Sequence, residues 1–305
     1  MEKHRKKLIK NAAVFDGHSS GLAQGKKIVI EDDIVTEITA DEVSEENFDE
    51  VFDGTGMVAM PGMTDAHVHM GCLFAKGEFP VDYATVLTVA KCKDALMAGF
   101  TTFRDAGSVS EGLKLAFDEG VLPGPRIYPC GAYISQTCGH GDSEYAHTYR
   151  DIQYRHPSST VLADGVPEII RAVREQFYRG ASHIKLTATE ILNRHEDIRL
   201  LFGTDMMITR PDYQVEQSED IRDYEKRFGT MRALRALTGT ANEVFALTTY
   251  QNPYPKGKIG VLEAGSYADL LLVDGDPTKS VSVLADTDHL RLIMKGGTVY
   301  KNTLC

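Results

Sequence analysis

Two histidines at alternate positions of one β-type run, His67 and His69, are well suited to holding a metal ion. They close the segment 60–69. On a strand, residues two apart point to the same side, so both imidazoles can reach one ion at the carboxyl end. The chain has 10 histidines, so a His-x-His pair alone is not specific. The Pro-Gly turn before the pair, Asp65 and Gly71 strengthen the metal-site interpretation.

Segments with helix-like and strand-like sequence patterns alternate in the part of the chain that positions these histidines. A helix is predicted over 82–98, with Gly99 just after its end, and a second is predicted to begin at Pro167 and to end before Gly180. Proline in the first turn of a helix and glycine just past its end are typical of helix termini. A third, over 230–247, carries apolar residues on one face. Such alternation is typical of a parallel sheet with helical crossovers, as a barrel or a doubly wound sheet.

The number of strands indicates that a barrel would be incomplete. Five segments have the character of barrel strands: one ending at His69, then 100–105, 126–135, 183–187 and 198–202. A complete eight-stranded barrel needs roughly 250 residues, and the available segment, 60–255, is shorter than that. We therefore expect an α/β fold with an incomplete (β/α) TIM-type barrel.

Both ends of the chain read as short strands separated by turns. We expect residues 1–58 and 256–305 to form one composite β-sandwich, with the barrel domain spanning 59–255. The alternative is two independent β regions at the two ends. If the composite domain forms, strands from the two termini lie side by side.

Charge and cysteine usage narrow the possible partners and compartment. The 305-residue chain has 33 Lys+Arg, 44 Asp+Glu and a net charge of −11, which disfavours binding to nucleic acid or an anionic membrane. Its 5 cysteines are scattered without a Cys-x-x-Cys pair, which argues against a disulfide framework or a thiolate zinc site. No apolar run reaches transmembrane length, and none of signal-peptide length follows the basic N-terminus. These features predict a cytoplasmic protein.

Taken in order, several segments resemble the metal-dependent amidohydrolase superfamily. The likeness is closest to the branch of imidazolonepropionase-like enzymes and Xaa-Pro or Xaa-Arg dipeptidases. The segments that carry it follow the family's order and cover nearly the whole chain: 60–69, 98–107, 134–142, 164–185, 202–205 and 258–277. Six matching segments in the family's order are far more specific than any one motif.

The resemblance implies a set of site residues and a reaction. His67 and His69 would be metal ligands, Lys185 a bridging ligand as a carbamate, and Asp205 both a ligand and the general base. His140, in the loop that resembles the family's active-site loop, would contact substrate. The family holds one or two divalent ions such as zinc, whose activated water hydrolyses C–N bonds. The implied partners are small molecules or dipeptides.

Each of these residues also has an ordinary interpretation. On the expected strand 182–187, Lys185 shares a face with His183 and points away from the helix-packing side, but it could be an ordinary strand lysine. Asp205 could simply cap the turn after its strand. His140 stands between two glycines and could be a surface histidine. We expect His183 to be a hydrogen-bonded core or interface histidine rather than a ligand.

The chain departs from the family between Lys185 and Asp205. The family places two further metal-binding histidines between the corresponding positions, on its fifth and sixth strands. In this chain Lys185 and Asp205 are only 20 residues apart, which leaves no room for two more strands. Only His195 and His289 follow Lys185, and neither stands at a strand end. About 100 residues, roughly three βα units, are missing relative to the family's barrel. We therefore expect at most one metal ion per chain.

Three interpretations follow from this shortened barrel. The chain is a working amidohydrolase with a mononuclear site, a non-catalytic relative that serves in binding or assembly, or a truncated product of an internal deletion, splicing or a faulty gene model. A mononuclear deaminase of the superfamily fits less well, because such deaminases do not use the carbamate. An incomplete barrel leaves strand edges open, which predicts a homo-oligomer.

Overall fold

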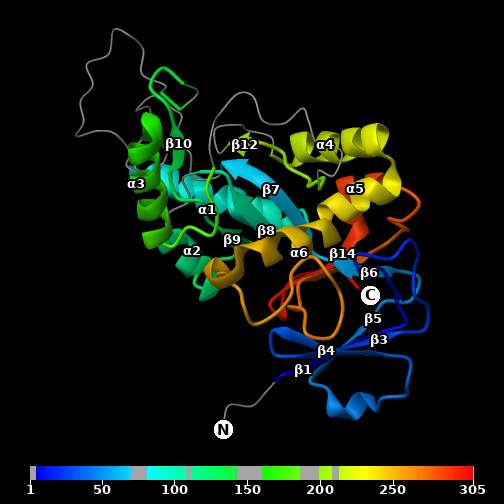
Figure 1. Cartoon of the computed structure of the whole chain (residues 1–305). Coiled ribbons are helices and arrows are strands. Elements are labelled where there is room, and N and C mark those ends of the chain that lie inside the picture. Colours follow the sequence, from blue (N-terminus) through cyan, green and yellow to red (C-terminus); the bar gives the residue numbers. More distant parts are fainter. Residues whose placement is uncertain are drawn as a thin grey trace.

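The computed structural model describes residues 5–69, 81–107, 111–139, 141–142, 160–185, 199–207 and 213–304. Figure 1 shows strands of the N-terminal region at one end of the molecule and a helix-flanked parallel sheet at the other. Strands near the C-terminus lie between them. Among the described residues, no helix is both long enough and apolar enough to span a bilayer.

One sheet is built entirely from the first part of the chain. It has four strands in the order β4-β3-β1-β5. β1 runs antiparallel to β3 and parallel to β5. Its strands are β1 (Lys6–Lys10), β3 (Lys27–Glu31), β4 (Ile34–Thr39) and β5 (Glu50–Asp53), with a 3₁₀ turn at Glu45–Asn47.

A second sheet joins the two ends of the chain. Its order is β15-β14-β13-β6-β2, and β13 pairs antiparallel with β6, with Leu271 opposite Met60. The strands are β2 (Ala13–Val14), β6 (Val58–Pro61), β13 (Leu270–Val273), β14 (Leu290–Lys295) and β15 (Thr298–Asn302). The 3₁₀ turns Val281–Ala285 and Thr287–His289 connect β13 to β14.

The continuous apolar sequence of β13 reflects burial on both faces of this second sheet. Leu270 and Leu272 belong to an apolar cluster shared with the first sheet, whereas Leu271 and Val273 belong to the core of the helical region. Because successive side chains of a strand point to opposite faces, all four must be apolar. The two sheets thus share one apolar cluster. The sandwich class and the boundaries 1–58 and 256–305 remain predictions.

The third sheet is parallel and positions the candidate site. Its order is β12-β7-β8-β9, with α1 connecting β7 to β8 and α2 connecting β8 to β9. The elements are β7 (Met63–His69), α1 (Val81–Met97), β8 (Phe100–Asp105), α2 (Glu111–Asp118), β9 (Arg126–Tyr128) and β12 (Met206–Met207). A separate parallel pair, β10 (Tyr133–Ser135) and β11 (Thr160–Leu162), precedes α3 (Gly165–Tyr178). The fold is mixed α/β, and no sheet closes into a barrel within the described residues.

The expected strand 126–135 is two strands in the structure. Pro129 and Gly131 lie between β9 and β10, and Gly131 has a φ of 69°, which extended chain does not adopt. The N–H of Ala132 donates to Gln176 Oε1 of α3 rather than to a neighbouring strand. Proline and the left-handed glycine therefore end the first strand.

Two other expected strands are irregular where they are described. In 199–202, the N–H of Phe202 donates to Ala236 O of a helix, so this segment forms no regular ladder. In 183–185, the carbonyl of Lys185 accepts from the N–H of Ile134, again without a ladder. Residues 186–187 and 198 lie outside the described part of the chain.

The expected helix 230–247 is interrupted at Thr238. A Cβ added to Gly239 would lie 2.1 Å from the carbonyl oxygen of Gly17, so a loop from the N-terminal region packs directly against the helix backbone. Thr238 has φ −134° and ψ −100°, outside helical geometry. The resulting elements are α5 (Thr230–Leu237), α6 (Gly239–Phe245) and the 3₁₀ turn Ala246–Gln251. A separate helix, α4 (Tyr213–Phe228), precedes them.

Candidate metal centre

β7 places His67 and His69 on one face at the carboxyl end of the parallel sheet. Val68, between them, points to the opposite side and is packed in the apolar core. The two imidazole rings lie 5.3 Å apart, centroid to centroid. The side chain of His69 is 6% exposed and that of His67 is 44% exposed, so only one ring faces solvent.

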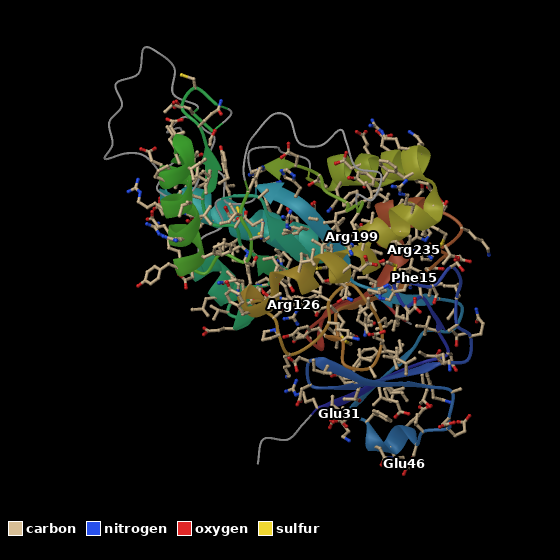
Figure 2. The ribbon with its side chains drawn as sticks, in the orientation of Figure 1. Phe15, Glu31, Glu46, Arg126, Arg199 and Arg235 are labelled. Carbon is tan, nitrogen blue, oxygen red and sulfur yellow. The ribbon has the colours of Figure 1, made fainter. Side chains whose placement is uncertain are left out.

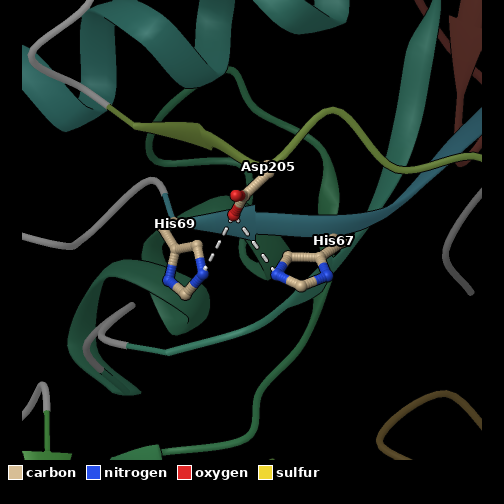
Figure 3. Close-up of side chains that lie close together, drawn as sticks. All are labelled: His67, His69 and Asp205. Carbon is tan, nitrogen blue, oxygen red and sulfur yellow. Dashed lines mark ion pairs between the residues drawn. The ribbon is translucent and has the colours of Figure 1, made fainter. Parts of the chain in front are cut away.

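Asp205 and Lys185 reach the same two imidazoles from separate segments of the chain. Asp205 Oδ1 lies 3.3 Å from His67 Nε2 and 3.4 Å from His69 Nε2, as Figure 3 shows. Lys185 Nζ lies within hydrogen-bonding distance of the same nitrogens, at 3.0 and 2.9 Å. Four of the site residues named from the sequence therefore lie together. His140, the fifth, lies outside the described residues.

The environment keeps both imidazoles neutral near pH 7. Burial, together with the positive charge of Lys185, lowers the pKa of His67 and of His69 to about 4. Metal ions bind the neutral imidazole, because only that form has a free lone pair on the ligating nitrogen. Near pH 7 both rings are therefore already in the neutral form that binds a metal ion.

Asp65 connects the two chain segments that carry the histidines and Asp205. Its carboxylate is fully buried and accepts hydrogen bonds from the Thr204 hydroxyl at 2.7 Å, the Thr204 N–H at 3.2 Å and the His67 N–H at 3.1 Å. Burial raises the pKa of Asp65 to about 7, and these three donors act in the opposite direction. Asp65 thus fixes the residue that precedes Asp205.

The backbone of Asp205 is also held by β7. Its N–H donates to His67 O at 2.8 Å, and its φ of 55° is left-handed. This turn lets the chain pass beside β7 and continue into β12. Sequence reasoning treated Asp65 only as part of the histidine motif. A carboxylate on a strand that is otherwise buried was the signal that it has a structural partner.

His183 and Arg104 lie near the centre without belonging to it. His183 Nε2 is 3.0 Å from Asp105 O, and its Nδ1 is 3.0 Å from the Ser182 hydroxyl, so this partly buried ring is hydrogen-bonded, as expected from the sequence. Arg104 Nη1 donates to Ala66 O at 3.4 Å, and burial lowers the pKa of its guanidinium. Sequence reasoning missed Arg104, whose charge faces the interior.

The donor set fits a zinc-like ion. Two donors on one tetrahedral zinc, each about 2.0–2.1 Å from the ion, stand about 3.4 Å apart. The two histidine–aspartate separations, 3.3 and 3.4 Å, match that value. His67, His69 and Asp205 offer ligand atoms that all lie within 4.8 Å of one another. Lys185 presents an amine, so carboxylation is required before it offers an oxygen ligand.

Comparison with known proteins identifies the segment that contains most of this centre. Residues 58–198 match the family model described as Amidohydrolase family. This segment is similar to the amidohydrolase family. His67, His69 and Lys185 fall inside it, whereas Asp205 lies beyond its end, so the place of Asp205 in the centre rests on the geometry given above.

Two curated proteins are similar to part of this chain. The chain is 34% identical to ochratoxinase of Aspergillus niger over 152 residues, which are 43% of this chain and 31% of that protein. It is 39% identical to imidazolonepropionase of Picrophilus torridus over 176 residues, 53% of this chain and 43% of the relative. The chain therefore matches less than half the length of these curated relatives.

Solved structures show that the likeness in fold extends well beyond residues 58–198. The crystal structure of the A. niger ochratoxinase aligns with a TM-score of 0.79 at 18% identity, covering 99% of this chain and 97% of that one. A prolidase complexed with N-methylphosphonate-L-proline aligns with a TM-score of 0.77 at 21% identity, covering 97% and 100%. At these identities the likeness concerns the fold.

Proposed function

We propose that the chain is a metal-dependent amidohydrolase that hydrolyses amide or peptide-like C–N bonds of small substrates, such as dipeptides or N-acyl amino acids. The observation that carries the proposal is the convergence of His67, His69, Lys185 and Asp205 within hydrogen-bonding or ion-pair distance. The family that residues 58–198 match and the names of the chain's relatives, an ochratoxinase and a prolidase, support the same bond class.

In this proposal His67, His69, Asp205 and the carbamate of Lys185 hold one zinc ion. Such an ion lowers the pKa of a bound water and polarises a substrate carbonyl. The Asp205 carboxylate accepts the proton of the attacking water and passes it to the leaving amine. Its side chain is 68% exposed, so substrate can approach it, while the buried His69 stays fixed. We keep His140 as a proposed substrate contact.

The test is hydrolysis by protein purified with zinc and bicarbonate, the latter as a source of carbon dioxide for the carbamate. Xaa-Pro dipeptides, Xaa-Arg dipeptides and N-acyl amino acids are offered, and amino-acid release is measured. We expect turnover that Asp205→Asn reduces by at least about a hundredfold, because the general base is lost. Asp41→Asn, an exposed aspartate of the first part of the chain, is the matched control and should leave turnover unchanged.

Elemental analysis of the same samples measures the metal content. We expect at most one zinc per chain, and two would contradict the proposed ligand set. A folded chain with one zinc but no turnover of any of these substrates would overturn the catalytic proposal in favour of the non-catalytic, binding alternative.

A further inference from the structure

A concave surface lies apart from the candidate metal centre. It is a groove of about 640 Å³ formed by residues 199–200, the end of α4, and parts of α5 and α6. None of His67, His69, Lys185 and Asp205 lines it. Figure 2 labels two of its residues, Arg199 and Arg235, close to α5. We call this surface the arginine groove.

The arginine groove concentrates positive charge in an acidic protein. It is lined by Arg199, Arg232 and Arg235, with Glu243 as the only acidic residue among its lining residues, in a chain of net charge −11. Arg199 Nε donates to Glu243 Oε2 at 2.9 Å, which compensates that one carboxylate. Neither Arg232 nor Arg235 forms an ion pair with a described carboxylate. Within the part of the chain that the structure describes, these two guanidinium groups therefore form no ion pair.

These two arginines can act on one ligand. They are three residues apart on α5 and so lie on the same side of that helix. Guanidinium groups present rigid pairs of N–H donors that match the oxygens of phosphate and carboxylate. Because neither guanidinium forms an ion pair among the described residues, a doubly charged phosphate monoester matches the two arginines better than a single carboxylate.

Apolar side chains complete the arginine groove. Leu200, Phe228 and Met231 line it beside the arginines, and Phe228 is 36% exposed. The guanidinium of Arg232 lies 5.6 Å from the centre of the Phe228 ring. A ligand that bound only through charge would leave this apolar surface in contact with water.

We propose that the arginine groove binds a small phosphate monoester, with its phosphate on Arg232 and Arg235 and its apolar group against Phe228 and Met231. This site is separate from the proposed hydrolytic centre. It does not depend on zinc, on Lys185 carboxylation or on amidohydrolase activity.

The experiment is isothermal titration of the full chain with phenyl phosphate, inorganic phosphate, benzoate and benzyl alcohol. We expect phenyl phosphate to bind at least about tenfold more tightly than each of the others. Arg232→Gln and Arg235→Gln should each weaken phenyl phosphate binding about tenfold, since each removes charge-assisted hydrogen bonds. Arg174→Gln replaces an exposed arginine of α3 outside the groove and is the matched control, with no change expected.

Two further binding measurements distinguish binding at the arginine groove from binding at the metal centre. Asp205→Asn and chelator-treated protein should bind phenyl phosphate like the wild type, with circular dichroism verifying that every variant is folded. No measurable binding, equal binding of inorganic phosphate, or equal weakening by Arg174→Gln would overturn the proposal. Binding that is lost with zinc would assign the ligand to the metal centre and would also overturn it. Benzoate binding as tightly as phenyl phosphate would overturn the preference for a dianion.

Discussion

At the scale of single residues, the candidate centre depends on a buried carboxylate that is not itself a proposed ligand. Asp65 accepts three hydrogen bonds, two of them from Thr204, the neighbour of Asp205. Groups that orient metal ligands contribute to affinity because the ligands then need not be ordered when the ion binds. In the proposed centre, Asp65 is such an orienting group, because it holds the segment that carries Asp205.

Replacement of Asp65 by alanine tests its positioning role. Asp65→Ala removes three hydrogen bonds to a buried carboxylate, so we expect a loss of about 3 kcal/mol in the free energy of unfolding. Zinc affinity should fall by about tenfold to a hundredfold, because the segment bearing Asp205 is no longer tied to β7. Chemical denaturation and zinc competition with a chelator measure the two effects.

The control for Asp65→Ala separates positioning from general destabilisation. Leu271→Ala, in the core of β13, should cost a similar free energy of unfolding, about 3 kcal/mol, without touching the centre. We expect its zinc affinity to stay at the wild-type value under conditions where both variants are folded. If both variants lost zinc affinity equally, Asp65 would have no specific role.

At the scale of elements, close packing between backbones decides where helices end. α5 and α6 would be one helix by their apolar pattern, but Gly239 lies against Gly17 at the break. Only a residue without a side chain allows this approach. The loop that contains Gly17 also connects to the C-terminal part of the chain, because Leu262 N–H donates to Asp16 O.

Glycine-to-alanine replacements at two helical positions should have opposite effects. Gly239→Ala places a Cβ against the Gly17 carbonyl, and we expect a loss of about 1–3 kcal/mol in the free energy of unfolding. Gly112→Ala, in α2, meets nothing within 4 Å and should increase stability by about 0.5–1 kcal/mol. Chemical denaturation of both variants tests the pair. An unchanged stability of Gly239→Ala would show that the loop moves away at little cost.

At the scale of the whole molecule, a buried ion pair joins the parallel sheet to the sheet built from both termini. Arg126 of β9 donates to both carboxylate oxygens of Asp269, at 2.7 and 3.2 Å, and its guanidinium lies 3.8 Å from the Tyr267 ring centre. The Asp269 carboxylate also accepts from the N–H of Gly296. Both charges are buried, so each depends on the other.

Breaking this ion pair should destabilise the whole chain. Asp269→Ala leaves a buried guanidinium without its partner, and we expect a loss of about 3–5 kcal/mol in the free energy of unfolding. The double variant Arg126→Met with Asp269→Leu removes both charges and should recover part of that loss. Denaturation followed by circular dichroism measures both. If the double variant were as unstable as Asp269→Ala, lost packing rather than the unpaired charge would be the cause.

The open sheets predict self-association of the whole molecule. β12 and β9 are the outer strands of the parallel sheet, and no sheet closes among the described residues. The Tyr254 hydroxyl bonds the N–H and the carbonyl of Ile127 in β9, but a sheet edge that is not covered in this way offers backbone donors and acceptors to a second chain. We expect light scattering at micromolar concentration to show a homo-oligomer. A monodisperse monomer would contradict this expectation.

The sequence by itself determined the elements whose signals are local. The run ending at His69 is β7, 100–105 is β8, and a helix occurs near 82–98, because alternation, periodicity and end residues act within a few positions. The helix expected to open at Pro167 begins two residues earlier, at Gly165. The sequence also predicted the candidate site residues, through the resemblance of ordered segments. His67 and His69 share a face because both lie on β7.

Only the tertiary structure decided how separate segments meet. That Asp205 and Lys185 both reach the two imidazoles depends on hydrogen bonds and packing between residues far apart in the sequence. The same is true of Asp65 and Thr204, of the break at Thr238, and of the irregular segments 199–202 and 183–185. Local patterns specify the conformation of a segment and the face it buries, but they do not specify its partner. The partner is set by the packing of the whole chain.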